Sequence, residues 1–202
     1  MTTPRDVLSF WFGTLGDDGF ADEAVRKRWF ESSRTFDAAC RDTFAETLDA
    51  VADNKLADWL IEPAGRLAYI VLCDQLPRNI YRGDARAFAW DSYALAAARE
   101  GVARGDDLQL ALDERCFFYM PFEHSENLVD QHLAVGLFTH VRDSSPKARR
   151  ELTGNALRYA QQHRDIVLRF GRFPHRNAVL GRASSEAEKE FVAGSDGFGQ
   201  SA

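Results

Sequence analysis

Apolar residues recur along most of this chain at intervals of three and four, the spacing that places side chains on one side of an α-helix. The clearest run follows Ser33, a candidate N-cap, and comprises Phe36, Cys40, Phe44, Leu48 and Val51. No segment alternates apolar and polar residues as a half-buried strand does. With proline, glycine and capping residues as boundaries, the pattern predicts helices over about residues 4–12, 22–30, 33–51, 63–76, 87–104, 113–119, 125–142, 145–170 and 185–192.

This order of elements predicts an all-α fold of about eight or nine helices, a multi-helix array of antiparallel helix pairs joined mostly by short connections. The length of 202 residues suits one domain with a single core. We expect a single helical domain over residues 1–193. Residues 194–202 are small and polar, so we expect a flexible C-terminal tail there.

Composition argues against two classes of function, broad nucleic-acid binding and membrane association. Hydrophobic residues make up 45% of the chain and the net charge is −6, as in a globular protein that does not bind nucleic acid broadly through phosphate contacts. No apolar run is long enough to span a bilayer, so we expect no membrane association. Cys40, Cys73 and Cys116 are far apart, and no CxxC pair is present, which favours reduced thiols and a cytoplasmic location.

The most unusual stretch is 163–182, which contains five arginines, two histidines, no lysine and a single acidic residue. Arginine interleaved with Phe170, Phe173 and Pro174 is typical of guanidinium groups held against apolar surface, where they meet carboxylates or phosphates. This stretch therefore marks a candidate anion-binding region in an acidic protein.

Three phrases contain most of the residues that could perform chemistry: Asp74–Gly83 (DQLPRNIYRG), Pro121–Glu126 (PFEHSE) and Phe170–Arg182 (FGRFPHRNAVLGR). With the opening Val7–Gly13 (VLSFWFG), they resemble the bacterial family known as domain of unknown function 924. The resemblance extends over nearly the whole chain. It implies a helical fold similar to tetratricopeptide-like superhelices, and it implies no activity and no catalytic residues.

Asp74 follows Ile70 and Val71 by one helical turn, so its carboxylate should face the interior or a cleft. A buried carboxylate needs a cation, and either Arg78 or an arginine of the 163–182 stretch could supply it. Two interpretations stay open. Asp74 is either half of a structural ion pair between helices or a site carboxylate suited to acid–base work.

Glu123 and His124 lie at a helix junction, where adjacent side chains can reach one pocket, and Ser125 is the expected N-cap of the next helix. His163 interrupts an apolar stripe. Such a histidine is more often a core residue bonded to a carbonyl or carboxylate than a ligand-binding one, and the sequence allows both interpretations.

Gly171 and Pro174 break the long helix and should expose backbone N–H groups beside several basic side chains. The phrase after Pro77 has a similar composition, so we expect the two breaks to meet with Glu123 and His124 between them. The alternative is that the arginines bind helix C-terminal carbonyls and nearby carboxylates. The candidate catalytic residues are His124, Glu123, His175 and Asp74, and the candidate ligand-binding residues are Arg78, Asn79, Arg82, His163, Arg172, Arg176 and Asn177.

The leading hypothesis is one polar pocket for a small anionic or phosphorylated ligand, without a metal or another cofactor, because no metal-binding spacing is present. Whether the protein is an enzyme is left open. The alternative is a tetratricopeptide-like adaptor that binds a partner peptide without catalysis. Its anchors would be the exposed members of a group of aromatic residues: Trp11, Phe12, Trp29, Phe30 and Trp90.

Overall fold

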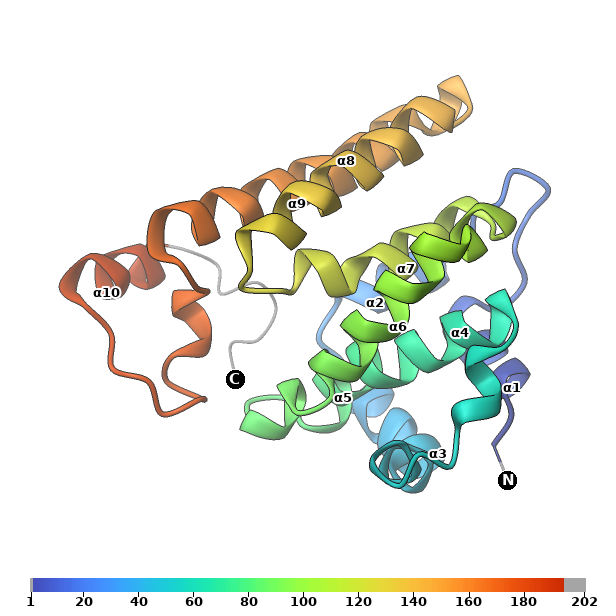
Figure 1. The fold of residues 1–202 in the computed structure, drawn as a ribbon, viewed down its shortest axis with the longest axis horizontal. Coiled ribbons are helices and arrows are strands. Elements are labelled where there is room, and N and C mark those ends of the chain that lie inside the picture. The colour runs from blue at the N-terminus through green and yellow to red at the C-terminus, as the bar shows by residue number, and fades with distance from the viewer. Residues whose placement is uncertain (1, 195–202) are drawn as a thin grey trace.

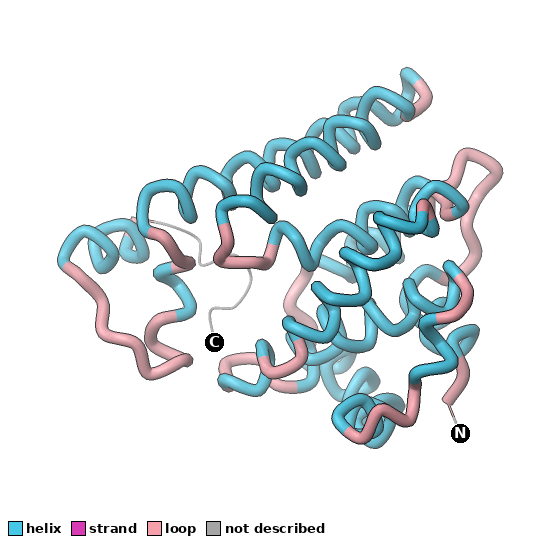
Figure 2. The backbone as a smooth tube through the Cα atoms, in the orientation of Figure 1, coloured by secondary structure: helices cyan, strands magenta, loops and turns pink. Residues whose placement is uncertain are grey.

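The computed structural model describes residues 2–194, and its regular structure within that range is helical, as predicted, without a β-strand (Figures 1 and 2). Residues 195–202, most of the expected tail, lie outside the described range. The α-helices are α1 (Pro4–Phe12), α2 (Glu23–Phe30), α3 (Arg34–Ala52), α4 (Pro63–Ile70), α5 (Leu76–Ile80), α6 (Asp91–Arg104), α7 (Leu112–Glu123), α8 (Leu128–Ser144), α9 (Arg150–Phe170) and α10 (Glu186–Ala193). Between α4 and α5 the chain forms a π-helix, Val71–Gln75, and short 3-10 helices fill several connections.

Capping residues set several of the predicted boundaries. The Thr3 hydroxyl accepts the Asp6 N–H at 3.3 Å, and the Asp6 carboxylate accepts the Thr3 N–H, which closes a capping box on α1. Ser33 caps α3, and Ser185 forms a second capping box with Glu188 at the start of α10. The cap predicted at Ser33 is confirmed, and so are the helix starts predicted near residues 4 and 185, with Thr3 and Ser185 as their caps.

The predictions that Pro77 and Pro121 each end a helix were wrong. Pro77 follows the π-helix, in which the Leu76 N–H bonds the Val71 carbonyl five residues earlier. This wider turn accommodates a ring that lacks an N–H donor, so the chain continues helically into α5. Pro121 lies inside α7 and is buried, and the helix runs on to Glu123. Tertiary packing thus outweighs the local preference.

Two other helix starts differ from the sequence prediction. Asn127, not Ser125, caps α8, and its side-chain oxygen accepts the Val129 N–H at 2.8 Å. The Ser125 hydroxyl instead accepts the Asn127 N–H at 3.2 Å and donates to Asp130 at 2.7 Å. Ser125 therefore shapes the turn before the helix. A 3-10 turn precedes α6 and another precedes α9, which moves both α-helix starts beyond the expected residues.

The main core is rich in aromatic residues from α1, α2 and α7. The Phe117 ring packs edge-on against Trp11, Phe12 and Trp29, with centroid separations of 5.6, 5.3 and 4.6 Å. All three partners are buried, so they are not available as surface anchors for an adaptor, whereas Phe30 is 68% exposed. The cysteines are free thiols.

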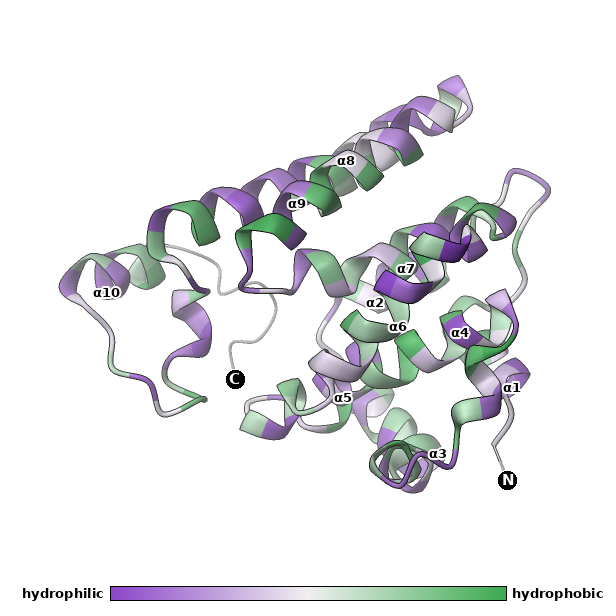
Figure 3. Cartoon of the chain, in the orientation of Figure 1, coloured by the Kyte–Doolittle hydropathy of each residue, from purple (hydrophilic) through white to green (hydrophobic). Residues whose placement is uncertain are grey.

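Helices α8 and α9 lie side by side as a long hairpin beside the body formed by the earlier helices, and α7 contacts both (Figure 1). Hydrophilic and hydrophobic residues alternate along the two helices, as expected where one side of each is buried (Figure 3). A tetratricopeptide-like superhelix is not confirmed, because element lengths range from 5 residues in α5 to 21 in α9 and a π-helix interrupts the array. The base of the hairpin is the end at which α8 begins and α9 finishes. There, helix ends from several parts of the chain come together.

Candidate functional site

Polar and charged side chains gather where α7 turns into α8. The π-helix, α5, the start of α6, the end of α7, α9 and the 3-10 helix Pro174–Arg176 each contribute to them. Their mutual contacts, described below, join the three phrases singled out in the sequence. We refer to this group as the junction cluster, and it consists of Asp74, Arg78, Asp91, Glu123, His124, His163 and Arg176.

Asp74 and His124 form the central pair of the junction cluster. The His124 Nδ1 atom lies 2.8 Å from Asp74 Oδ1 and 3.0 Å from Oδ2. The Gln75 side-chain amide also donates to Asp74, which is 1% exposed. Burial raises the pKa of Asp74, but the charge of Arg78 and the contact with His124 outweigh burial and hold that pKa well below its usual range. Asp74 is therefore a buried, ionised carboxylate, as the sequence position suggested.

His124 is a neutral base at pH 7. Burial lowers its pKa below the ordinary 6.5, and although Asp74 opposes this shift, the positive charge of Arg78 adds to it. The ring is not sealed off, since 16% of the side chain is exposed. Because Asp74 binds Nδ1, the other ring nitrogen, Nε2, is the one available to a ligand or water.

The π-helix aims Asp74 at His124. Inserting one extra residue per turn rotates the side chains that follow, and such turns are found often at functional sites. Because the chain remains helical past Pro77, Arg78 stays one turn from Asp74, and its Nη1 lies 3.4 Å from Asp74 Oδ1. Of the two cation partners that the sequence allowed for Asp74, Arg78 is therefore the one in contact with it.

Arg78 is fully engaged by its neighbours. It makes a two-pronged contact with Asp91, at 3.0 and 3.1 Å, and it also donates to the Asp74 carbonyl. Burial lowers the pKa of Arg78, but Asp74 and Asp91 raise it more, so the guanidinium is charged. Asp91 was missed in the sequence analysis, because an acid in the first turn of a helix is expected there for helix stability alone.

Arg176 has a different environment. It is 7% exposed, and its guanidinium lies between the rings of Phe88 and Phe173, 4.7 and 4.6 Å from their centroids. Its ion pair with Asp91 is long, 3.6 Å, and its side chain donates no hydrogen bond to any residue in the 2–194 range. Burial and then the charge of Arg78 lower the pKa of Arg176 to about 10.

Glu123 and His163 contact each other beneath these groups. The His163 Nδ1 atom lies 2.9 Å from the Tyr159 carbonyl oxygen and 3.1 Å from Glu123 Oε1. Burial, with a smaller effect from Asp74, raises the pKa of Glu123 to about 8, and burial lowers the pKa of His163 to about 3. Both are uncharged at neutral pH. His163 has the backbone carbonyl partner expected of a core histidine.

Gln131 fixes the turn that presents Glu123 and His124. Its side-chain amide donates to the carbonyl oxygens of Glu123 and Ser125, at 2.6 Å each, and the residue is fully buried. Burying a polar amide in this way orders the α7–α8 junction. His175 lies nearby, with its ring 5.5 Å from that of Phe173, and burial followed by Arg176 lowers its pKa to about 4.

The remaining candidate residues make their contacts outside the junction cluster. Arg82 and Asn79 both bind the carboxylate of Asp37, with Arg82 donating at 2.8 and 2.9 Å and Asn79 at 2.8 Å. The Asn177 side chain donates to Ser184 at 3.0 Å and accepts from Arg182 at 2.9 Å. These residues tie segments of the fold together, as the structural alternative in the sequence analysis described.

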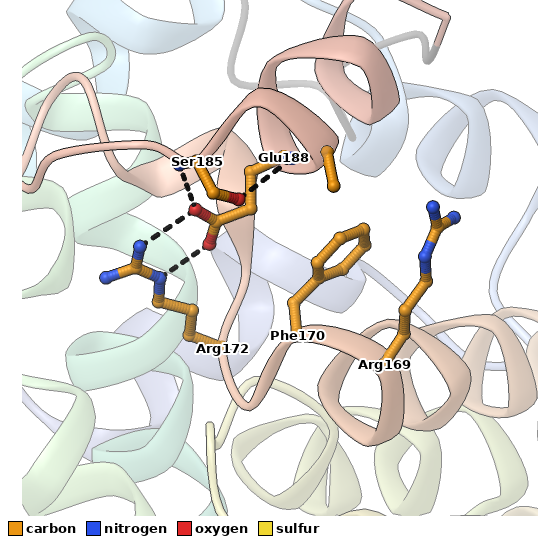
Figure 4. Close-up of a pocket in the computed structure, with 6 residues that line it drawn as sticks. Arg169, Phe170, Arg172, Ser185 and Glu188 are labelled. Atoms are coloured by element: carbon orange, nitrogen blue, oxygen red, sulfur yellow. Dashed lines mark hydrogen bonds and ion pairs between the residues drawn. The ribbon is translucent and has the colours of Figure 1, made fainter.

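Arg172 borders a hollow between the end of α9 and the start of α10 (Figure 4). The hollow has a volume of about 490 Å³, and Arg172 donates to Glu188 there at 2.7 and 2.9 Å. This ion pair engages two of the three charged residues that line the hollow, so the hollow offers less chemistry than the junction cluster does. The residues that line it are Arg169, Phe170, Arg172, Ser185, Ala187 and Glu188.

No set of three or more His, Cys, Asp and Glu side chains between residues 2 and 194 is arranged to hold a metal ion. None of the helices described is both long and apolar enough to cross a membrane. Residues 7–196 match the family described as "Bacterial protein of unknown function (DUF924)". The chain belongs to this family.

The fold also has a solved counterpart. The "Structure of Protein of Unknown Function ATU0120 from Agrobacterium tumefaciens" is similar to this chain, with 35% sequence identity and a TM-score of 0.78. The similarity covers 94% of this chain and 96% of that one. No curated protein matches. The family match and the solved counterpart therefore agree on the fold of this chain.

Proposed function

We propose that this DUF924 protein is a cytoplasmic protein that binds a small anionic ligand at the junction cluster, with Arg176 as its main contact. The observation that supports the proposal most directly is the side chain of Arg176, which is 7% exposed and whose Nε atom is a buried donor without a hydrogen-bond partner among residues 2–194. A guanidinium has five N–H donors, and a carboxylate or phosphate oxygen is the partner that fits them.

Burying the charged side chain of Arg176 lowers the stability of the folded protein. Its pKa is lowered to about 10 from 12.5, which at neutral pH corresponds to about 3 kcal/mol of lost stability. The charged form is the one disfavoured, so this cost is present throughout the range below pH 10. A ligand anion would offset the cost by restoring hydrogen bonds and a counter-charge. This is the pattern expected of a ligand-binding residue.

An adaptor function has less support. Three of its five candidate aromatic anchors are buried, and Arg78 of the junction cluster is already paired with Asp74 and Asp91 of the same chain. A partner's acidic tail would therefore compete with groups already in place, whereas a small anion needs only the donors that Arg176 leaves open.

The test is titration calorimetry with acetate, succinate and inorganic phosphate on wild-type protein and on Arg176→Met. Methionine fills a similar volume between Phe88 and Phe173 without a charge, so this variant should fold and melt at the wild-type temperature or above it. We expect saturable binding of at least one anion by the wild type and at least a tenfold weaker affinity in the variant.

Arg172→Met is the contrasting variant, because that guanidinium already has two hydrogen bonds to Glu188. It should lower the melting temperature and leave anion binding intact. Equal loss of binding in both variants would point to a diffuse basic surface, and a lower melting temperature in Arg176→Met without any anion binding by the wild type would make Arg176 a structural residue.

A further inference from the structure

His124 has the geometry of a general base. Asp74 contacts Nδ1 through both of its oxygens, at 2.8 and 3.0 Å, which fixes the ring and places the proton on Nδ1. Nε2 then carries a lone pair, and it makes no hydrogen bond within residues 2–194 although 16% of the side chain reaches the surface. A base in this state can take a proton from water or from a bound ligand.

The charges around His124 indicate what kind of anion the site accepts. Arg78 and Arg176 contribute two positive charges, and Asp74 and Asp91 contribute two negative ones. Glu123 and the three histidines of this region are uncharged at neutral pH, as their shifted pKa values indicate. A dianionic phosphate would face two carboxylates with no surplus of cations, so a monoanion such as one carboxylate fits better.

We propose, building on the anion-binding function above, that the junction cluster hydrolyses carboxylic esters of substrates that carry one free carboxylate. Arg176 binds that carboxylate, and His124 is the catalytic residue that activates water. Asp74 is a positioning residue, since it acts only through His124. The ester carbonyl is neutral, so it adds no charge to a cluster that already contains the carboxylates of Asp74 and Asp91.

In this reaction the His124 Nε2 atom removes one proton from a water molecule as the water oxygen forms a bond to the acyl carbon. When the tetrahedral intermediate collapses, the ester C–O bond breaks and its electron pair leaves with the alkoxide. The proton on Nε2 passes to that alkoxide. The products are a carboxylic acid and an alcohol, and His124 is returned to its starting state.

The test uses three chromogenic substrates and the full-length protein: the para-nitrophenyl monoester of succinic acid, para-nitrophenyl acetate and para-nitrophenyl phosphate. We expect release of nitrophenolate from the succinate monoester with kcat/KM roughly 100-fold above that for the uncharged acetate ester. The phosphate should be inert. Faster turnover of the phosphate would overturn the choice of substrate class.

Three variants separate the roles. His124→Gln and Asp74→Asn should each lower kcat by roughly 100-fold or more with little change in KM, and Arg176→Met should mainly raise KM for the succinate monoester alone. His132→Gln, an exposed histidine of α8, is the matched control and should behave as wild type. If His124→Gln keeps wild-type kcat, the general-base assignment is wrong.

Binding is measured in parallel with succinamate, an amide with one carboxylate and no ester bond. One outcome is that succinamate binds to wild type but not to Arg176→Met, while wild type cleaves no ester faster than His124→Gln does. In that case the hydrolytic proposal fails and the anion-binding function stands. If succinamate and the other anions all fail to bind, both fail together. For Asp74→Asn, an unchanged kcat with a lower melting temperature would show that Asp74 only stabilises the fold.

Discussion

Glu123 offers a direct test of the electrostatics of the junction cluster. It is 6% exposed, and burial together with Asp74 raises its pKa to about 8 from an ordinary 4.5. Below pH 4.5 the carboxyl is neutral in the folded and unfolded states, so its burial has no ionisation cost. Above pH 4.5 the unfolded state releases the proton and the folded state retains it up to about pH 8, so stability falls across this window.

The magnitude follows from the same two pKa values. Each pH unit within the window costs about 1.4 kcal/mol, so the loss is about 3 kcal/mol at pH 7 and about 5 kcal/mol above pH 8. Glu123→Gln removes the ionisable group and keeps the shape of the side chain. Compared with wild type, this variant should therefore gain stability as the pH rises from 4.5 to 8 and show little gain at pH 4.

Urea unfolding of wild type and Glu123→Gln at intervals from pH 4 to pH 9 measures the difference in their free energies of unfolding, provided that the two m values agree. Glu126→Gln is the matched control, because the pKa of Glu126 is shifted in the opposite direction to that of Glu123. Although burial opposes it, the hydrogen bonds from Arg182 lower the pKa of Glu126, so its stabilising effect is present above pH 4.5 and is lost as pH falls through the folded pKa. A Glu123→Gln gain that is constant across the whole range would refute the assignment of a buried, neutral Glu123.

Three further predictions concern the scaffold, and each is measured by chemical or thermal unfolding. Gly65→Ala should destabilise by about 1–3 kcal/mol, because its Cβ would collide with the Trp59 backbone carbonyl, which cannot move as a side chain can. Asn127→Ala removes the cap of α8 and should cost about 1 kcal/mol. Arg66→Met should cost about 3 kcal/mol because it deprives buried Asp106 of a 2.8 Å partner, and a second change, Asp106→Leu, should recover part of the loss.

Local signals in the sequence were enough to predict much of the fold. Thr3, Ser33 and Ser185 are followed by the apolar spacing and first-turn residues of a helix, and each begins one in the structure. The rule that proline ends a helix failed at Pro77 and Pro121, because the cost of one missing N–H donor is outweighed by packing around both residues. The sequence pattern does not show that packing.

The candidate site was predictable only in part, because the partner of each arginine depends on tertiary folding. Arg172 and Arg176 are four residues apart in one basic stretch, and residue type and spacing give them the same candidate role. Folding brings Glu188 of α10 within 2.7 Å of Arg172, whereas the oxygens of Asp91, which Arg176 approaches at 3.6 Å, already accept from Arg78. A guanidinium whose donors stay open is therefore a property of the folded chain. It is also what makes Arg176 the residue whose replacement should affect a ligand more than the fold.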